Sequence, residues 1–332
     1  MDKRIKVAIL GAGSWGCALA HVLLDNGHKV SIWTIDEKER DMLNNYKEQQ
    51  DKLPGVLLSG DVSATSNIEE AILDANVIIM AVPSVFVRNT SKLLKDIIND
   101  NQIIVDVAKG IEEETLLTLS QQIKEESGSD KIVVLSGPSH AEEVGKNIPT
   151  AVVAASTDLE LSKYIQSIFM NNYFRVYTSL DVHGVELAAA LKNVIALAAG
   201  MADGLGTGDN TKAALITRGA KEVADIGVAS GGNVETFYGL AGIGDLIVTC
   251  GSQHSRNRKA GYLIGKGYSY EEAMKEVKMI VEGVYSACAA YNLAKKHNIE
   301  APIIFAVYDI LFNNKKARES LVELMHRDGK ME

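Results

Sequence analysis

Short runs of aliphatic and β-branched residues recur over the first 180 residues, and segments with a helical spacing of apolar positions separate them. Several runs are continuously apolar, as expected where helices cover both faces of a parallel sheet. Helices are predicted between them, for example at Gly16–Asn26 and Val87–Ile98. The alternation indicates an α/β domain with a doubly wound sheet. The predicted strands are Lys6–Leu10, Lys29–Trp33, Val77–Ala81, Ile103–Asp106, Ile132–Ser136, Ala151–Ala155 and Phe174–Tyr177.

The pattern changes after Asp181. Strand-like runs disappear, and long helical patterns rich in Ala and Leu continue, interrupted by glycine-containing breaks. The most apolar stretch, Val185–Ala202, carries Lys192 and Asn193 near its middle. A lipid-facing span would bury that ammonium at high cost, so a buried core helix is predicted. We expect a doubly wound domain over residues 1–180 and an all-α domain over residues 181–332.

Composition narrows the class of function. A net charge of −9 argues against a nucleic-acid or anionic-membrane partner, which would require a basic face. The three cysteines and seven histidines show no metal-ligand spacing, so neither a disulfide framework nor a metal site is predicted. The chain begins Met1-Asp2-Lys3-Arg4 and runs straight into a predicted strand, which leaves no room for a signal peptide. A cytoplasmic protein without an integral membrane segment is expected.

A glycine-rich motif follows the first predicted strand and opens a predicted helix. Gly11 permits a tight turn, Gly13 lets the backbone approach a pyrophosphate, and Gly16 lets the helix pack against the strand. The N–H groups and the positive dipole end of the helix then point at the phosphates. The combination predicts a Rossmann-type dinucleotide site. The motif reads Gly11-Ala12-Gly13-Ser14-Trp15-Gly16.

The second predicted strand bears on the choice of dinucleotide. It ends at Trp33, and Asp36 follows where an acidic residue accepts hydrogen bonds from a ribose 2′-hydroxyl. No Arg is adjacent to hold a 2′-phosphate. The alternative is that Asp36 belongs to a solvated helix start. The pattern slightly favours NAD over NADP.

Two lysines are candidates for acid–base chemistry, because no Ser-His-Asp pattern is present. Lys109 follows the strand predicted at Ile103–Asp106 and therefore lies at a carboxyl end, where open α/β sheets bind ligands. Lys192 lies in the apolar helix, where desolvation lowers a lysine pKa and suits it to exchange protons with an alcohol or ketone. Its alternative is a surface lysine with a buried stem. Asn193 could hydrogen-bond a substrate oxygen.

Two polar segments of the second half are further candidates. Asp245 stands at a glycine-rich turn before an apolar run, where a carboxylate could act on the lysine ammonium or cap a helix. Ser255-Arg256-Asn257-Arg258-Lys259 is a basic cluster in an acidic protein. Ser255 could cap a helix whose N-terminus, with Arg256, binds a phosphate. The alternative for this cluster is a solvated helix face.

Several separated motifs, in one order over essentially the whole chain, resemble the bacterial NAD(P)-dependent glycerol-3-phosphate dehydrogenases of the biosynthetic type. The resemblance implies reversible reduction of dihydroxyacetone phosphate to sn-glycerol 3-phosphate for glycerophospholipid synthesis. A homodimer is compatible with it. The motifs are Gly11–Gly16, Ala81–Ser84, Lys109–Glu112, Leu135–Ala141, Glu186–Val194, Gly239–Leu246, Thr249-Cys250, Ser255–Arg258 and Val281–Val284.

The resemblance also implies residue roles. Lys192 is implied as proton donor and acceptor, Lys109 as a contact of cofactor and substrate, and Asp245 completes the catalytic candidates. Domain closure at the glycine-rich turns would exclude water. The candidate substrate site comprises Lys109, Gly137, Ser139, Lys192, Asn193, Asp245, Thr249, Ser255, Arg256 and Asn257. The candidate cofactor site comprises Gly11, Gly13, Ser14, Trp15, Gly16, Asp36, Lys109, Ala141, Arg256 and Glu282.

This chain departs from the family pattern at one place. Many bacterial members carry a basic residue where it has Ile35 or Asp36, which weakens the case for NADP. Two other functions stay open. One is a related hydroxyacid or sugar-phosphate dehydrogenase, and the other is a catalytically silent dinucleotide-sensing regulator, which would need neither Lys109 nor Lys192.

Overall fold

The computed structural model describes residues 4–329 and residue 331, and the chain divides into two compact units. Unit 1 comprises Met1–Lys109 and Leu117–Glu186, and unit 2 comprises Gly110–Leu116 and Leu187–Glu332. The segment Gly110–Leu116 belongs to unit 2 although the chain on both sides of it belongs to unit 1, an exchange that the sequence pattern did not indicate.

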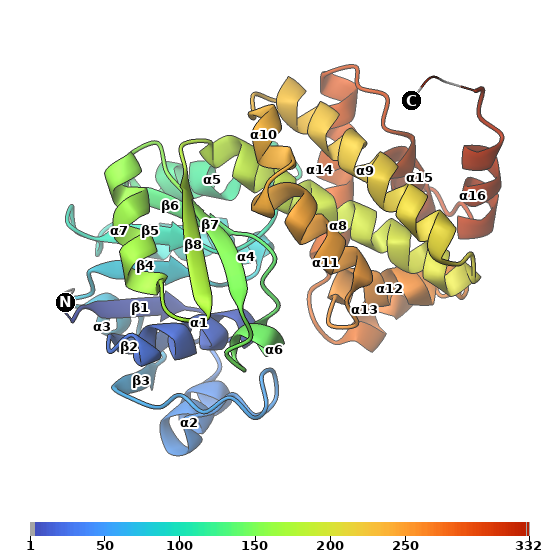
Figure 1. Ribbon diagram of the computed structural model, residues 1–332. Coiled ribbons are helices and arrows are strands. Elements are labelled where there is room, and N and C mark those ends of the chain that lie inside the picture. The colour runs from blue at the N-terminus through green and yellow to red at the C-terminus, as the bar shows by residue number, and fades with distance from the viewer. Residues whose placement is uncertain (1–3, 330, 332) are drawn as a thin grey trace. The chain divides into compact units, whose positions relative to one another are not determined.

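Unit 1 is built on an eight-stranded sheet (Figure 1). The strand order is β3-β2-β1-β4-β5-β6-β7-β8, and neighbours are parallel from β3 through β6. The chain thus winds outward in both directions from β1, as predicted for a doubly wound sheet. The strands are β1 (Lys6–Leu10), β2 (Lys29–Trp33), β3 (Val62–Thr65), β4 (Val77–Met80), β5 (Ile103–Asp106), β6 (Ile132–Ser136), β7 (Thr150–Ala155) and β8 (Phe174–Ser179).

Hydrophobic cores lie on both faces of this sheet. Val7 and Ile9 pack in one core with α1, α6 and α7, whereas Ala8 and Leu10 pack in the other with α3, α4 and α5. Because alternate strand residues point to opposite faces, a strand covered on both faces needs apolar side chains throughout. The helices of unit 1 are α1 (Ser14–Asp25), α2 (Glu37–Tyr46), α3 (Ile68–Ile72), α4 (Ser84–Leu94), α5 (Leu119–Ser127), α6 (Ala141–Val144) and α7 (Leu159–Phe169).

The sheet differs from the sequence-based expectation in two places. β3 was not predicted, because its four residues, Val62-Ser63-Ala64-Thr65, carry two hydroxyls and form the edge of the sheet. β7 pairs antiparallel with β6, although a parallel sheet was expected. The connection between them carries only the four-residue helix α6, which packs against α1 and is too short to act as the usual crossover helix of a parallel pair.

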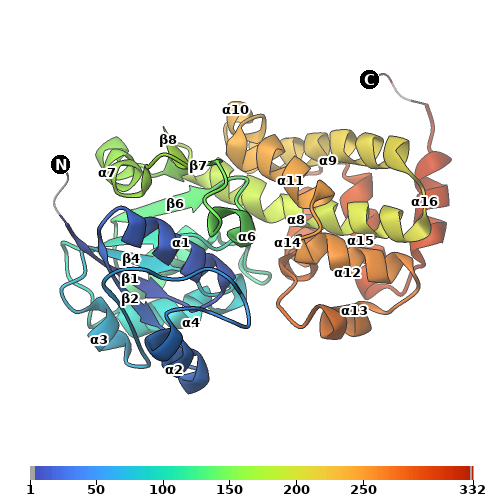
Figure 2. The same ribbon diagram turned by 60° about the horizontal axis from the view of Figure 1, so that its bottom comes forward.

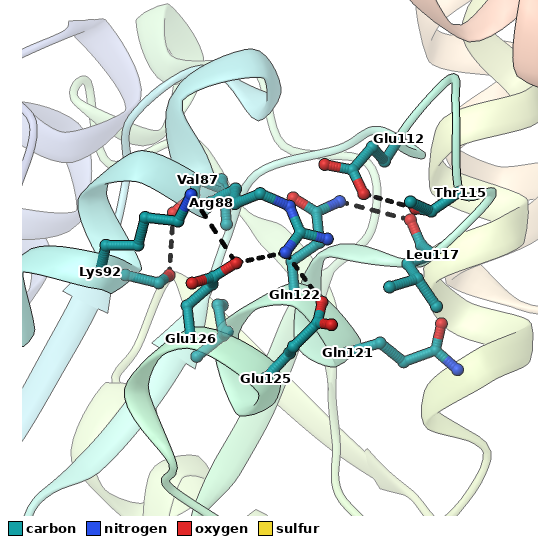
Figure 3. Close-up of polar contacts among 12 residues, drawn as sticks. Val87, Arg88, Lys92, Glu112, Thr115, Leu117, Gln121, Gln122, Glu125 and Glu126 are labelled. Atoms are coloured by element: carbon teal, nitrogen blue, oxygen red, sulfur yellow. Dashed lines mark hydrogen bonds and ion pairs between the residues drawn. The ribbon is translucent and has the colours of Figure 1, made fainter. Parts of the chain in front are cut away.

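Helices α4 and α5 pack side by side, and a cluster of charged side chains joins them (Figure 3). Arg88 Nη1 lies 2.8 Å from Glu125 Oε2 and also pairs with Glu126. Lys92 Nζ lies 4.0 Å from Glu126 Oε1. Such partly exposed pairs contribute about 0–1 kcal/mol each, so buried apolar residues supply most of the stability of this helix pair.

The regular elements of unit 2 are helices over its described residues, and the unit has its own hydrophobic core (Figures 1 and 2). Within it, α8 lies against α9 and α12, and the turn before α11 is π-helical over Leu240–Gly244. The helices are α8 (Val182–Leu205), whose first turn belongs to unit 1, α9 (Asp209–Ala229), α10 (Val234–Phe237), α11 (Asp245–Gly251), α12 (Arg256–Gly265), α13 (Tyr270–Val277), α14 (Glu282–Lys296), α15 (Pro302–Phe312) and α16 (Ala317–Met325).

Helix α8 is long and apolar enough to cross a membrane, but the apolar window within it is entirely buried in the protein. Ala and Gly residues let other helices approach it closely, and the polar side chains of Lys192 and Asn193 are buried with it. The prediction of a buried core helix is confirmed.

Candidate active site

The glycine loop of unit 1 has the geometry of a phosphate-binding turn. Gly11 has φ +121°, and a Cβ there would lie 2.7 Å from the carbonyl oxygen of Ala81, so only glycine is tolerated. A Cβ on Gly16 would lie 2.2 Å from the Gly11 carbonyl oxygen, which explains how closely α1 approaches the loop. Around Gly13, by contrast, no atom lies within 4 Å of a Cβ position, so the backbone faces open space. The three glycines therefore fit a dinucleotide pyrophosphate.

The N-terminus of α1 adds positive potential to this turn. The helix begins at Ser14, and its N-cap is Gly13, which has no side chain to bond the first amide groups. Trp15 is partly buried against the core of unit 1, so it holds the first turn in place. Free N–H groups and the helix dipole favour an anion at this position.

Asp36 lies at the start of a helix, as one of the two sequence-based interpretations expected. It is the exposed N-cap of α2, and its Oδ1 accepts a hydrogen bond of 2.8 Å from the amide of Lys38. This geometry matches the helix-start alternative. A contact with the cofactor ribose remains a prediction.

Lys109, Gly137, Ser139 and Ala141 come together at the carboxyl ends of two neighbouring strands. Lys109 follows β5, and its Nζ donates to the carbonyl oxygen of Gly137, 3.2 Å away, just after β6. Ser139 Oγ donates to the same oxygen at 2.9 Å, and Ala141 begins helix α6. Gly137 has φ +147°, and a Cβ there would lie 2.9 Å from the Val152 backbone. Parallel pairing thus gathers residues 28 apart in sequence at one edge.

Lys192 is buried in the middle of α8, with 4% of its surface exposed, so it is not a snorkelling surface lysine. Its Nζ donates to Asp245 Oδ1 at 2.8 Å and to Thr249 Oγ1 at 2.6 Å. Asp245 and Thr249 stand one turn apart at the start of α11, so a single helix face presents both. The π-helical turn before α11 widens the backbone where Asp245 begins the helix.

Opposite effects act on the Lys192 ammonium. Burial disfavours its charge, and the adjacent carboxylate favours it. The sequence-based expectation included both effects, since it named Asp245 as a carboxylate that could act on this ammonium although the two residues are 53 apart along the chain. Asp245 is itself only 2% exposed, so each of the two charges depends on the other. Burial raises the pKa of the neighbouring Cys250 thiol to about 12, which disfavours its thiolate form.

Asn193 and Asn257 form a buried hydrogen-bonded bridge beside this pair. Asn257 Nδ2 donates to Asn193 Oδ1 at 2.9 Å, and Asn257 Oδ1 accepts from the amide of Gly283 at 2.8 Å. Asn193 Nδ2 donates to the carbonyl oxygen of Ala189 at 3.3 Å. Both amides are therefore largely engaged within the protein, which connects α8, α12 and the start of α14. Each side chain keeps one N–H and one oxygen lone pair for a substrate contact.

The basic cluster begins helix α12. Ser255 is the N-cap, its Oγ accepting from the Arg258 amide at 3.1 Å, so the predicted cap is confirmed. Arg256 is exposed, and its Nη1 donates to the carbonyl oxygen of Ile280 at 3.2 Å. Glu282 begins α14, next to the Gly283 amide that Asn257 binds. The N-terminus of α12 thus combines amide groups, a hydroxyl and a guanidinium, which suits a phosphate.

Sequence reasoning missed a buried carboxylate at the start of α8. Glu186 is 4% exposed, and it accepts hydrogen bonds from the Ser120 amide at 2.7 Å and from Ser120 Oγ at 2.6 Å. Burial nevertheless raises the pKa of Glu186 above its ordinary value. The carboxyl thereby holds the N-terminus of α5 against α8. The sequence alone contained no signal for this pairing beyond the presence of Glu186 in a family motif.

Comparison with known proteins gives a consistent result over the whole chain. Residues 6–162 match the family model of the NAD-dependent glycerol-3-phosphate dehydrogenase N-terminus, and residues 181–322 match that of its C-terminus. Proteins named glycerol-3-phosphate dehydrogenase [NAD(P)+] from Fusobacterium nucleatum and Agathobacter rectalis are 56% and 55% identical to the chain. These alignments cover 99% and 98% of this chain, and 98% and 97% of the respective relatives.

A solved structure shows the same fold. The crystal structure of glycerol-3-phosphate dehydrogenase from Coxiella burnetii superimposes with a TM-score of 0.94 at 36% sequence identity. The match covers 98% of this chain and 99% of that protein.

Proposed function

Because the chain belongs to the NAD-dependent glycerol-3-phosphate dehydrogenase family, we propose that it reduces dihydroxyacetone phosphate to sn-glycerol 3-phosphate with Lys192 as the proton donor. The chain is an NAD(P)-dependent oxidoreductase. The observation that supports the proton-transfer role is the buried contact of Lys192 with Asp245 and Thr249. Maintaining a buried ion pair is costly, and a dinucleotide-sensing module would have no use for it.

In the proposed reaction the bound nicotinamide supplies a hydride to the ketone carbon. As the π bond of the carbonyl group is lost, negative charge develops on the carbonyl oxygen. Lys192 Nζ gives that oxygen a proton. Asp245 keeps the ammonium charged before the transfer, and Thr249 fixes its orientation. The lysine then regains a proton from solvent. One hydride and one proton are consumed for each alcohol formed.

The remaining roles divide between the units. Unit 1 holds the cofactor through the glycine loop and the first turn of α1, with Lys109 and Ala141 at the neighbouring strand ends. Unit 2 holds the substrate phosphate at the N-terminus of α12, chiefly through Arg256 and the Ser255 cap. Phosphate binding energy positions the ketone for the reaction. The proposed domains are thus a cofactor domain followed by a substrate domain.

Three further features complete the proposal. NAD is the preferred dinucleotide, supported by the acidic Asp36 three residues after the end of β2. The protein works in the reducing cytoplasm for glycerophospholipid synthesis, which suits its three free cysteines. It assembles as a homodimer, the commonest closed oligomer, and light scattering measures this directly.

The catalytic assignment is tested with Lys192→Met, which keeps the length of the side chain and removes its charge. We expect kcat for dihydroxyacetone phosphate with NADH to fall by about 10²–10⁴-fold. NADH affinity should stay unchanged, because the glycine loop lies in unit 1. Lys221→Met is the control, since this lysine pairs with Asp225 on the exposed face of α9. Near-normal turnover of Lys192→Met would refute the assignment.

A stability control is needed for this variant, because removing the ammonium leaves Asp245 buried without its partner. Such a loss costs about 3–5 kcal/mol. The double variant Lys192→Met/Asp245→Asn removes both charges and should recover most of this stability while remaining inactive. Recovery of activity together with stability would show that the single variant had failed only by unfolding.

A further inference from the structure

Helices α8 and α12 contact each other along their whole shared length in a fixed parallel register. Asn257 bonds to Asn193, 64 residues earlier in the chain. The same offset recurs one turn further along, where Gly261 lies against the backbone of Leu197, and again where Gly265 lies against that of Met201. We call this contact the α8–α12 seam. The helix that carries Lys192 and the helix that begins with Arg256 are therefore in contact at successive turns.

Glycines allow this approach, because a Cβ would not fit. A Cβ on Gly261 would lie 2.1 Å from the carbonyl oxygen of Leu197, and one on Gly200 would lie 2.1 Å from that of Arg258. Gly204 and Gly265 are in the same situation, with backbone oxygens 2.3 Å from the Cβ position. Each of these obstacles is backbone, which does not rotate away as a side chain does. Any larger residue must push the two helix axes apart.

A partly buried charge cluster joins the same two helices at Asp203 and Arg258. Oδ2 of Asp203 on α8 accepts from Arg258 Nε at 2.7 Å and lies 2.6 Å from Arg258 Nη2, so the contact is two-pronged on the arginine side. Lys212 of α9 lies 2.7 Å from the other carboxylate oxygen. The side chain of Asp203 is 15% exposed, which shields these pairs from solvent better than surface pairs. The fork geometry of arginine restricts sliding of α12 along α8.

We propose that Gly261 and Asp203 are positioning residues, which set the distance between the proton donor Lys192 and the phosphate anchor at the start of α12. This inference rests on the proposed function. Substrate phosphate and substrate carbonyl are joined by a short fixed chain, so the two protein groups that bind them must keep a fixed separation. Proton transfer requires heavy atoms about 2.6–3.2 Å apart, and a displacement of about 1 Å costs about 10²-fold in rate.

Gly261→Ala tests the seam, because its Cβ would force the helices apart near the phosphate anchor. We expect kcat/KM for dihydroxyacetone phosphate to fall about 10²-fold, with a lower kcat and a higher KM, while the Kd for NADH is unchanged. Gly251→Ala is the matched control, a glycine at the end of α11 with no atom within 4 Å of its Cβ position. It should keep kcat/KM within about 2-fold, since exposed substitutions are near neutral.

A double-mutant cycle with Arg256→Ala separates positioning from general damage. If Gly261 acts through the phosphate anchor, adding Gly261→Ala to the Arg256→Ala protein should lower kcat/KM by no more than about 3-fold, instead of 10²-fold. Full multiplication of the two effects would overturn the seam proposal and leave the anchor standing. If Arg256→Ala alone left KM unchanged, the phosphate anchor itself would be wrong, and the seam proposal with it.

Asp203→Asn keeps the test decisive should Gly261→Ala fail to fold. The amide matches the carboxylate in size and weakens the two-pronged contact with Arg258. We expect about a 10-fold loss of kcat/KM in the wild-type background and less than about 2-fold in the Arg256→Ala background. Equal losses in both backgrounds, or no loss in either, would contradict the positioning role.

Discussion

Glu222 gives a prediction about stability that runs against the usual behaviour of carboxylates. It lies on α9, is 5% exposed, and accepts hydrogen bonds from the amides of Ile303 and Ile304 at the start of α15, at distances between 2.9 and 3.1 Å. Those amides, with Arg218 and Arg327, lower its pKa, but burial outweighs them and raises it from 4.5 to about 7. The folded protein therefore holds a proton on Glu222 under conditions where the unfolded chain releases it.

The sign of the effect follows from proton binding. Between pH 4.5 and 7 the folded state binds more protons at this carboxyl than the unfolded state does, so its contribution to stability falls as the pH rises. From pH 5 to pH 8 the loss amounts to about 2.5 kcal/mol for this shift. In a helical unit of this size that corresponds to roughly 5–10 °C in melting temperature.

The perturbation that tests this is Glu222→Gln, which resembles the protonated side chain and does not ionise. The two proteins should melt at similar temperatures at pH 5, and the Gln variant should be the more stable one at pH 8. Circular dichroism at helical wavelengths is the suitable assay, because both tryptophans, Trp15 and Trp33, lie in unit 1 and would not report on unit 2. Glu276→Gln, on the exposed face of α13, makes the same charge change as a control.

The stability of wild type minus that of Glu222→Gln, taken at each pH, cancels the contributions of all other titrating groups. This holds provided that those groups do not couple to Glu222. A difference that stays flat from pH 5 to pH 8 would refute the reasoning. So would a difference that grows in favour of the wild type, because it would mean that the amides at the start of α15 outweigh burial.

The other predictions concern the cofactor half. Gly13→Ala should leave the melting temperature unchanged, because its Cβ meets no protein atom. It should weaken NADH binding measured by fluorescence titration. A loss of stability that matches the loss of binding would show that Gly13 is structural. Gly11→Ala should instead destabilise the protein by several kcal/mol, through positive φ and the contact with Ala81, and an unchanged melting temperature would contradict the loop geometry. Asp36→Asn keeps the cap of α2 and removes its charge, so stability should hold while the ratio of kcat/KM for NADPH over NADH rises; a constant ratio would argue that Asp36 is only a helix cap.

Much of unit 1 could be predicted because its signals are local. Six strands begin and end within one residue of the predicted bounds, since continuous apolar runs between turn residues leave few alternatives. The edge strand β3 was missed because only one of its faces is fully buried, and its pattern resembles a loop. The reversed direction of β7 was missed because pairing direction depends on how the connection packs, which the strand sequence itself does not encode.

The candidate active site likewise has some features that the sequence predicts and others that depend on packing. The glycine loop and the Ser255 cap were predictable, because their geometry arises from residues within a few positions of each other. Asp245 was suggested from the sequence as a carboxylate that could act on the lysine ammonium, but its direct contact with Lys192 was not predictable, because Asp245 reaches Lys192 only after α11 has packed on α8. The bridging role of Asn257 was not predictable either. Its Nδ2 and Oδ1 both form hydrogen bonds inside the protein, and these bonds depend on the positions of three helices.

The sequence by itself thus determined the fold class, the nucleotide loop and the candidate lysines, since backbone conformation and apolar periodicity are properties of neighbouring residues. Only the tertiary structure decided that Lys192 is paired with Asp245, that burial raises the pKa of Glu222, and that the α8–α12 seam joins the helix of Lys192 to the helix that begins with Arg256. The physical reason is common to all three. Charge in a low-dielectric interior and contact between backbones depend on distances of a few ångströms between residues far apart in the chain, and packing alone sets those distances.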